Sequence, residues 1–197
     1  SGIGSLWWGV IGVLYFKSVS FVSPLELTIH RTVWTAFLLV FSISIYSKWN
    51  DVLIILKNFR TTSLLILTSI LIVGNWFTWI YAVTVNKLID AAFGYYIFPI
   101  ISVFFGILFL KESHNKMKLF SIALVIIAVI YLLLDLNTTP WIGLIVALTW
   151  SFYTLIRKKI KISTDVGLFI ESAFMTPFAI IAFFFIVKSG NNYFSLN

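Results

Sequence analysis

Between Leu64 and Val85 the chain runs for 22 residues without a single charged side chain. At about 1.5 Å per residue, a helix of this length crosses a hydrocarbon core of roughly 30 Å. Asn75 lies near the middle of the segment, where its amide has no water to bond and needs a protein partner or a ligand. Asn75, Thr78 and Ala82 share one helical face. The segment is therefore predicted to be a membrane-spanning helix whose polar face lines a cavity.

A second uncharged segment, Ala91–Leu110, follows after the polar joint Asn86–Asp90. Pro99 lies in the middle of this segment and removes one backbone donor, so the carbonyl one turn earlier needs another partner. A helix that is interrupted by proline, next to a helix with a polar face, is typical of a cavity wall at membrane depth. The two helices are predicted to form the centre of the functional site.

The composition places the chain among integral membrane proteins and excludes several other classes. Hydrophobic residues make up 60% of the sequence, charged residues make up 11%, and the mean hydropathy is +1.03. The sequence has no cysteine, only two histidines, and no metal-ligand, nucleophile or phosphate-loop motif. We therefore expect no metal, no cofactor and no enzymatic site. The formal net charge of +7 comes from cations scattered over short loops, which indicates membrane topology rather than a nucleic-acid partner.

Hydropathy predicts seven membrane-spanning helices: Gly2–Phe16, Leu25–Tyr46, Leu64–Val85, Ala91–Leu110, Leu119–Leu134, Trp141–Ile156 and Gly167–Val187. Cations cluster in the connections after the second, fourth and sixth of these helices. By the positive-inside rule these connections and the N-terminus are predicted to be cytoplasmic. The expected fold is an all-α, polytopic helical bundle in the lipid bilayer of the inner or plasma membrane.

A weak internal repeat relates the two ends of the chain. At an offset of 141 residues seven positions are identical without a gap, among them Gly2 and Gly143. The second copy begins five predicted helices after the first. Because five is odd, the second copy enters the membrane from the opposite side, as in the inverted repeats of many secondary transporters. We predict a complete five-helix repeat at 1–134 and the first two helices of an inverted repeat at 140–197, with three further helices missing. Chance similarity within a plain seven-helix bundle is the alternative.

The second predicted helix opens with a polar cluster. Glu26, His30 and Trp34 are four residues apart and share one face, and Arg31 lies one position round the helix. Without this cluster the rest of the helix is too short to span, so the cluster is expected within or at the edge of the membrane. One interpretation is a site that handles substrate or protons. The other is an ion-paired Glu26 and an Arg31 that snorkels to the headgroup level.

Glu171 occupies the position of His30 in the second copy of the repeat. A carboxylate five residues inside a predicted span is a candidate for proton coupling. A paired interfacial glutamate beside Lys161 is the alternative. Pro177 is predicted to kink the same helix.

Aromatic residues near mid-depth supply candidate cavity walls. Trp76 is adjacent to Asn75, and Tyr95 lies in the following span. Such rings suit an apolar or cationic organic ligand. Tryptophan and tyrosine also form the interfacial belts of membrane proteins in general, which is the alternative.

Four strings carry a resemblance to a known family: ELTIHRTVW, GNWFTWIYAV, DAAFGYYIFPIISVFFGILFLKE and WSFYTLIRKK. In order and over essentially the whole chain they resemble the RarD branch of the EamA family, within the drug/metabolite transporter superfamily. The resemblance implies ten helices in two inverted repeats and export of small molecules through a central cavity. The elements of the family fall on Glu26, His30, Arg31, Trp34, Asn75, Trp76, Tyr81, Gly94, Tyr95, Pro99 and Glu112. Asp90 departs from the glutamate expected before the alanine.

We therefore expect a secondary-active carrier that exports a small organic solute by alternating access. A truncated, non-transporting chain, or one completed by a second copy or by a partner, is the first alternative. A membrane-embedded enzyme is the second. The residues expected to contact substrate are Asn75, Trp76, Tyr81, Tyr95, His30 and Trp34; those expected to couple protons or gate are Glu26, Arg31 and Glu171; those expected to be structural are Pro99, Gly94 and Pro177.

Overall fold

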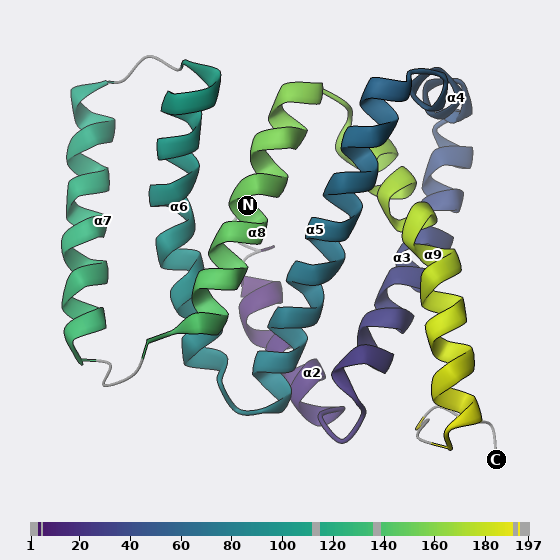
Figure 1. Ribbon diagram of the computed structural model, residues 1–197, viewed down its shortest axis with the longest axis horizontal. Coiled ribbons are helices and arrows are strands. Elements are labelled where there is room, and N and C mark those ends of the chain that lie inside the picture. Colours follow the sequence, from purple (N-terminus) through teal and green to yellow (C-terminus); the bar gives the residue numbers. More distant parts are fainter. Residues whose placement is uncertain (1–3, 5, 112–114, 136–138, 191–192, 194–197) are drawn as a thin grey trace. The chain divides into compact units, whose positions relative to one another are not determined.

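The computed structural model describes residues 4, 6–111, 115–135, 139–190 and 193, so Glu112 lies outside the described residues. Within these residues the regular structure consists of helices without a strand, which confirms the predicted all-α fold (Figure 1). In chain order the elements are the π-helix η1 (Trp7–Gly12) and the α-helices α2 (Val13–Ser18), α3 (Pro24–Ile45), α4 (Trp49–Lys57), α5 (Phe59–Thr84), α6 (Leu88–Leu110), α7 (Lys116–Asp135), α8 (Trp141–Ile160) and α9 (Thr164–Lys188).

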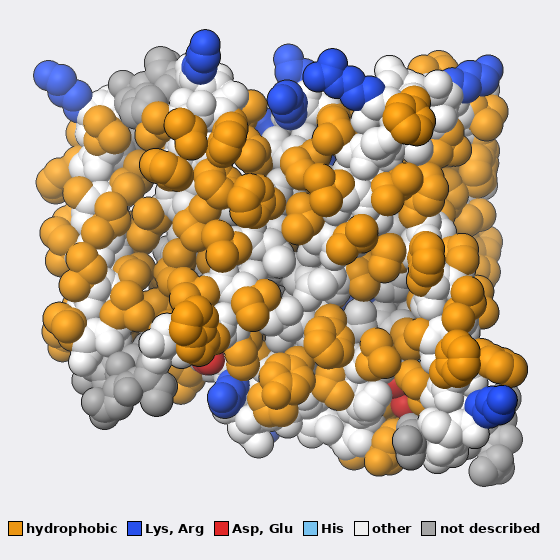
Figure 2. Space-filling model, viewed as in Figure 1, with side chains coloured by type: hydrophobic (Ala, Val, Ile, Leu, Met, Phe, Trp, Pro, Cys, Tyr) orange, Lys and Arg blue, Asp and Glu red, His pale blue; other side chains and the backbone are white. Residues whose placement is uncertain are grey.

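Each of the seven predicted spans contains a helix in its described part. Helices α3, α5, α6 and α9 are long and apolar enough to cross a membrane, whereas the apolar stretches Gly9–Ser18 and Leu119–Leu134 are shorter. Helix α8 has 20 residues, and its last turn carries Arg157, Lys158 and Lys159. In each part of the molecule, hydrophobic side chains cover the flanks of the helices and Lys and Arg side chains gather at helix ends (Figure 2). The chain is a multi-pass membrane protein.

Helix α4 occupies a connection for which the hydropathy predicts no helix. It lies across the ends of α3 and α5 rather than along them (Figure 1). Trp49, Leu53 and Leu56 share one of its faces and are 41%, 55% and 42% exposed. Lys57 ends the helix, and the exposed Asp51 lies on the opposite side. An amphipathic helix with this pattern lies in the headgroup layer of a membrane with its apolar face toward the acyl chains.

The position of α4 can be tested because the chain lacks cysteine, so a single introduced thiol can be labelled without background. A fluorophore on Leu53→Cys should be quenched by spin-labelled lipids in vesicles, because the apolar face of α4 points into the bilayer. The same fluorophore on Asp51→Cys, on the opposite side, is the matched control and should be quenched much less. Equal quenching at both positions would contradict an interfacial α4.

The chain divides into two compact units, and the first combines Ser1–Lys87 with Ser163–Asn197. In this unit α3 packs along α9, both helices contact α5, and α2 contacts α5 as well. Lys48, just after the end of α3, forms an ion pair with Asp165 in the first turn of α9. The end of one helix therefore meets the start of the other, and α3 and α9 run antiparallel.

The second unit, Leu88–Ile162, contains α6, α7 and α8. Helices α6 and α8 pack against each other over much of their length, and α7 contacts α6. The core of the unit is formed by Phe93, Ile97, Val129 and Ala147, which come from all three helices. The apolar faces of the three helices are thus buried against one another.

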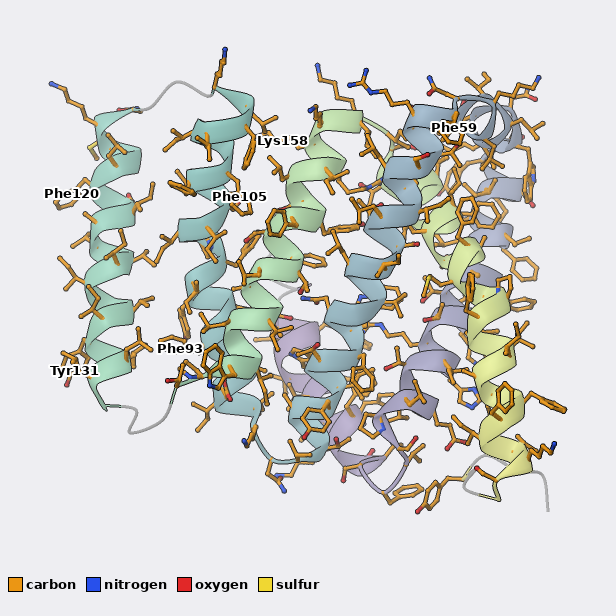
Figure 3. The ribbon with its side chains drawn as sticks, in the orientation of Figure 1. Phe59, Phe93, Phe105, Phe120, Tyr131 and Lys158 are labelled. Carbon is orange, nitrogen blue, oxygen red and sulfur yellow. The ribbon has the colours of Figure 1, made fainter. Side chains whose placement is uncertain are left out.

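Side chains on the two flanks of this unit point in different directions (Figure 3). The ring of Phe105 in α6 lies 4.7 Å from that of Phe152 in α8. Phe120 and Tyr131 project from α7 away from α6 and are 61% and 73% exposed. Large exposed rings on an apolar helix suit contact with lipid.

Two glycines allow α6 and α8 to approach closely. A Cβ atom added at Gly94 would come within 2.5 Å of the Gly143 carbonyl oxygen, and one added at Gly143 would clash with the Asp90 carbonyl oxygen. The Gly143 N–H, one of the first-turn donors that have no partner within α8, donates a 3.1 Å hydrogen bond to Asp90 Oδ1. Asp90 therefore caps a neighbouring helix. Helix α6 continues through Pro99, so the interruption expected there from the sequence is wrong.

Candidate functional site

A pocket of about 540 Å³ lies in the first unit, between η1, α2 and α3. This volume is within the range of pockets that hold small organic molecules. Its described lining residues are Trp7, Ile11, Gly12, Tyr15, Phe16, Leu27, His30, Arg31, Trp34, Thr35 and Leu38. The structure therefore brings His30, Arg31 and Trp34, which the sequence singled out, into one cavity.

The first helical segment supplies one wall of the pocket. Trp7, Ile11 and Tyr15 recur every four residues and line the pocket along one face of η1 and α2. Phe16, which is 7% exposed, meets the ring of Trp79 in α5 edge-on at 5.4 Å and anchors this wall. The four-residue spacing is visible in the sequence and could have identified the wall.

Arg31 and His30, the two basic side chains of the pocket, are held by other helices. Arg31 lies seven residues after Pro24, about 10 Å into α3 at 1.5 Å per residue. Its guanidinium carbon is 4.3 Å from the centroid of the Trp76 ring in α5, which is a cation–π contact. The His30 ring meets Phe183 of α9 edge-on at 5.4 Å. Helices α5 and α9 therefore hold both side chains in position.

The other predicted substrate contacts lie outside the described lining of this pocket. Asn75 is 5% exposed in the middle of α5. Tyr81, near the end of α5, is 42% exposed and stacks on Phe77 at 6.3 Å. Tyr95 belongs to the second unit, where it is 40% exposed. Trp76 of α5 contacts the pocket side chain Arg31.

Both predicted gating carboxylates are enclosed in protein. Glu171 lies seven residues after Thr164, and its Oε1 accepts a 2.6 Å hydrogen bond from the Thr68 hydroxyl of α5. Glu171 and Thr68 are both fully buried. Glu26 is fully buried as well, and both of its carboxylate oxygens accept from the Tyr193 backbone N–H, at 3.1 and 3.2 Å. The two carboxylates lie toward opposite ends of the antiparallel pair α3 and α9.

The ion pair between Lys48 and Asp165 fixes the end of this helix pair. The Lys48 Nζ lies 2.6 Å from Asp165 Oδ2, and the side chains are 33% and 26% exposed. Beside it, Trp49 of α4 meets Phe169 of α9 edge-on at 5.5 Å. Sequence analysis missed Asp165 and Thr68, because their partners lie 117 and 103 residues away along the chain.

Two further sequence expectations concern backbone shape and metal ions. Pro177 lies inside α9, which is continuous from Thr164 to Lys188. Within the described part of the chain, no group of three His, Cys, Asp or Glu side chains lies close enough together to hold a metal ion.

Comparison with known proteins gives the family. The model of the EamA-like transporter family matches residues 3–134. The chain belongs to the EamA-like transporter family. This membership confirms the resemblance that the sequence strings carry, and it agrees with the apolar, multi-helical fold of this EamA-like chain.

Individual relatives carry transporter and RarD names. An uncharacterized transporter of Vibrio cholerae is 36% identical over 190 residues, which are 96% of this chain and 63% of the relative. Protein RarD of Salmonella typhi is 33% identical over 195 residues, 96% of this chain and 66% of the relative. Protein RarD of Escherichia coli is 32% identical over 190 residues, which are 96% of this chain and 64% of the relative. The EamA-like chain spans about two thirds of the length of these relatives. No solved structure matches it.

Proposed function

We propose that this EamA-like chain acts in a secondary-active permease that exports a small organic solute by alternating access. The proposal depends above all on the pocket of about 540 Å³ lined by His30, Arg31 and Trp34, in a chain whose family consists of transporters. Its volume is within the range of pockets that hold small molecules. We place the permease in the inner or plasma membrane with its N-terminus in the cytoplasm, since the cation-rich connections then face inward.

The pairing of α3 with α9 supports an alternating-access cycle. Shifting α3 by 141 residues gives 165–186, close to the observed Thr164–Lys188 of α9. Helices related in this way by an inverted repeat can open a site first to one side and then to the other. In the proposed cycle the contact of Lys48 with Asp165 closes one end, and the hydrogen bonds to Glu26 close the other. A partly exposed ion pair costs little free energy to separate.

In this cycle the pocket holds the solute, and the predicted contacts of α5 act beside it. Asn75 is a buried amide next to Trp76 in the middle of α5, and a polar group at membrane depth is a candidate contact for a solute. Trp76 connects the segment to the pocket through Arg31. His30 and Glu171, near opposite ends of the α3–α9 pair, respond to protons. Trp34 lines the pocket, and Tyr81 is an exposed ring near the end of α5.

Replacing Asn75 by leucine should lower transport by about tenfold or more while the protein still inserts, because leucine keeps the volume but removes a buried hydrogen-bonding group. The measurement is uptake of labelled probes into everted membrane vesicles energised with a pH gradient, with protein level checked by immunoblot. Chloramphenicol belongs in the probe set because a relative in Pseudomonas aeruginosa, 22% identical over 120 residues, is named chloramphenicol-sensitive protein RarD.

Asn50→Leu is the matched control, since Asn50 is an exposed amide in α4 outside the spans. It should leave uptake unchanged. Normal uptake by Asn75→Leu would contradict the role given to Asn75. Absence of uptake for every probe by the unsubstituted protein would contradict the permease proposal itself.

A further inference from the structure

The described lining of the pocket that the proposed function assigns to the solute contains basic side chains but no acidic one. Arg31 carries a full positive charge and His30 is a basic group, and none of the described lining residues is Asp or Glu. The carboxylate of Glu171 accepts a hydrogen bond from Thr68 of α5 rather than lining the pocket. A cavity lined by one sign of charge with low-dielectric walls concentrates ligands of the opposite sign. The pocket therefore favours an anion over a cation.

The location of Arg31 also favours an anionic ligand. An arginine about 10 Å along a membrane helix is costly, and such residues face the interior of the protein or a cavity. The guanidinium carbon lies 4.3 Å from the centroid of the Trp76 ring, so the cation is held against an aromatic face. The N–H groups of a guanidinium lie in its plane, in a fork that fits the two oxygens of a carboxylate. Arg31, held against Trp76, therefore has the chemistry to bind a carboxylate in the pocket.

The other lining residues indicate the chemistry of the rest of the ligand. Trp7, Tyr15, Phe16 and Trp34 supply four aromatic side chains around the same space. Aromatic rings pack favourably on one another edge-to-face or offset, beyond the gain from burial alone. A volume of about 540 Å³ accommodates a fused-ring acid with room for water.

We propose that this pocket selects organic anions that join an aromatic body to a carboxylate, and that Arg31 is the residue that recognises the carboxylate. The inference deepens the proposed function and rests on it for its biological meaning. A pocket for cationic drugs or neutral solutes would not prefer such anions.

Three probes with the same ring system test the selectivity in the unsubstituted protein: naphthalene-1-carboxylate, naphthalene-1-carboxamide and 1-naphthylmethylamine. Equilibrium binding to the purified full chain in detergent should favour the carboxylate over the amide by about 10- to 100-fold, because a charge-assisted hydrogen bond is stronger than a neutral one. The amine should bind more weakly than the amide. Arg31→Gln should abolish the preference for the carboxylate, while Arg31→Lys should retain part of it, since lysine keeps the charge without the fork.

Arg60→Gln is the matched control, because Arg60 lies in the exposed first turn of α5 and outside the described pocket lining. It should leave all three affinities unchanged. If Arg31→Gln does not fold, Thr35→Trp gives an independent test: it fills the pocket without changing Arg31 and should weaken binding of all three probes together.

The outcomes separate this inference from the proposed function. Equal binding of the carboxylate and the amide would overturn the proposed selectivity. The selectivity would also be overturned if short-chain phosphatidylglycerol displaced the bound carboxylate at a lower concentration than unlabelled naphthalene-1-carboxylate does. In the second case the anion would be a lipid headgroup. Selective binding of the carboxylate together with no uptake of any probe into proteoliposomes would support the anion site and overturn the permease proposal.

Discussion

Replacing Gly143 by alanine should destabilise the packing of α6 on α8 by about 1–3 kcal/mol, although alanine is ordinarily the better helix former. The added Cβ atom would clash with the Asp90 carbonyl oxygen and lie 3.0 Å from the Gly94 nitrogen. Both are backbone atoms, so no side-chain rotation relieves the contact and the helices must move apart. Since helix association in a membrane depends on close packing, the second unit loses a main source of its stability. Against a total of about 5–15 kcal/mol, that loss is large.

Gly74→Ala is the matched control, because it makes the same chemical change in the middle of another apolar helix. A Cβ atom at Gly74 meets nothing within 4 Å, so alanine there should stabilise the protein by up to about 1 kcal/mol through helix propensity. Unfolding of the purified protein by increasing SDS, followed by circular dichroism, measures both effects. Gly94→Ala should add little to Gly143→Ala, since both act on one contact. Shifts of the same sign for Gly143 and Gly74 would contradict the close approach.

The long helices were predictable because the bilayer sets the length of an uncharged segment, and Leu64–Val85 meets that length by itself. Helix α4 was missed because a nine-residue amphipathic helix has neither the length nor the apolarity of a span. The effect of Pro99 was overestimated, since a membrane helix can continue through proline when neighbouring groups satisfy the freed carbonyl. The cap that Asp90 provides to α8 joins residues 53 positions apart, a contact that helical spacing within one segment does not reveal.

The polar part of the pocket was predictable for a different reason. A charged or ionisable group inside an apolar helix is costly, so His30 and Arg31 stood out against their surroundings. The aromatic wall from the first segment did not stand out, because Trp7 and Tyr15 are ordinary residues for a membrane helix. Thr68 was equally hidden, since a hydroxyl in a helix can bond to its own backbone and needs no distant partner. A single sequence does not show which helices pack together, and this packing makes such residues neighbours.

Under the proposed function, replacing Glu171 by glutamine should abolish the coupling of transport to a pH gradient and reduce gradient-driven uptake to the background of vesicles without the protein. Glutamine keeps the size of the side chain and can still accept the hydrogen bond from Thr68, so the packing of α9 on α5 should survive. It cannot bind and release a proton. A fully buried carboxylate differs greatly in free energy between its charged and neutral forms, so its protonation can shift the balance between two arrangements of the helices.

Exchange of labelled for unlabelled solute requires no net proton movement, so solute exchange by Glu171→Gln should remain close to that of the unsubstituted protein. Asp51→Asn, the same kind of change at an exposed position of α4, should affect neither measurement. Thr68→Val removes the hydrogen-bond donor and leaves the carboxylate in place. It should lower the free energy of unfolding by about 1–3 kcal/mol. The pH dependence of uptake should shift to a different pH range but remain. Full gradient-driven uptake by Glu171→Gln, together with an unchanged pH dependence in Thr68→Val, would mean that the Thr68–Glu171 hydrogen bond only joins α5 to α9.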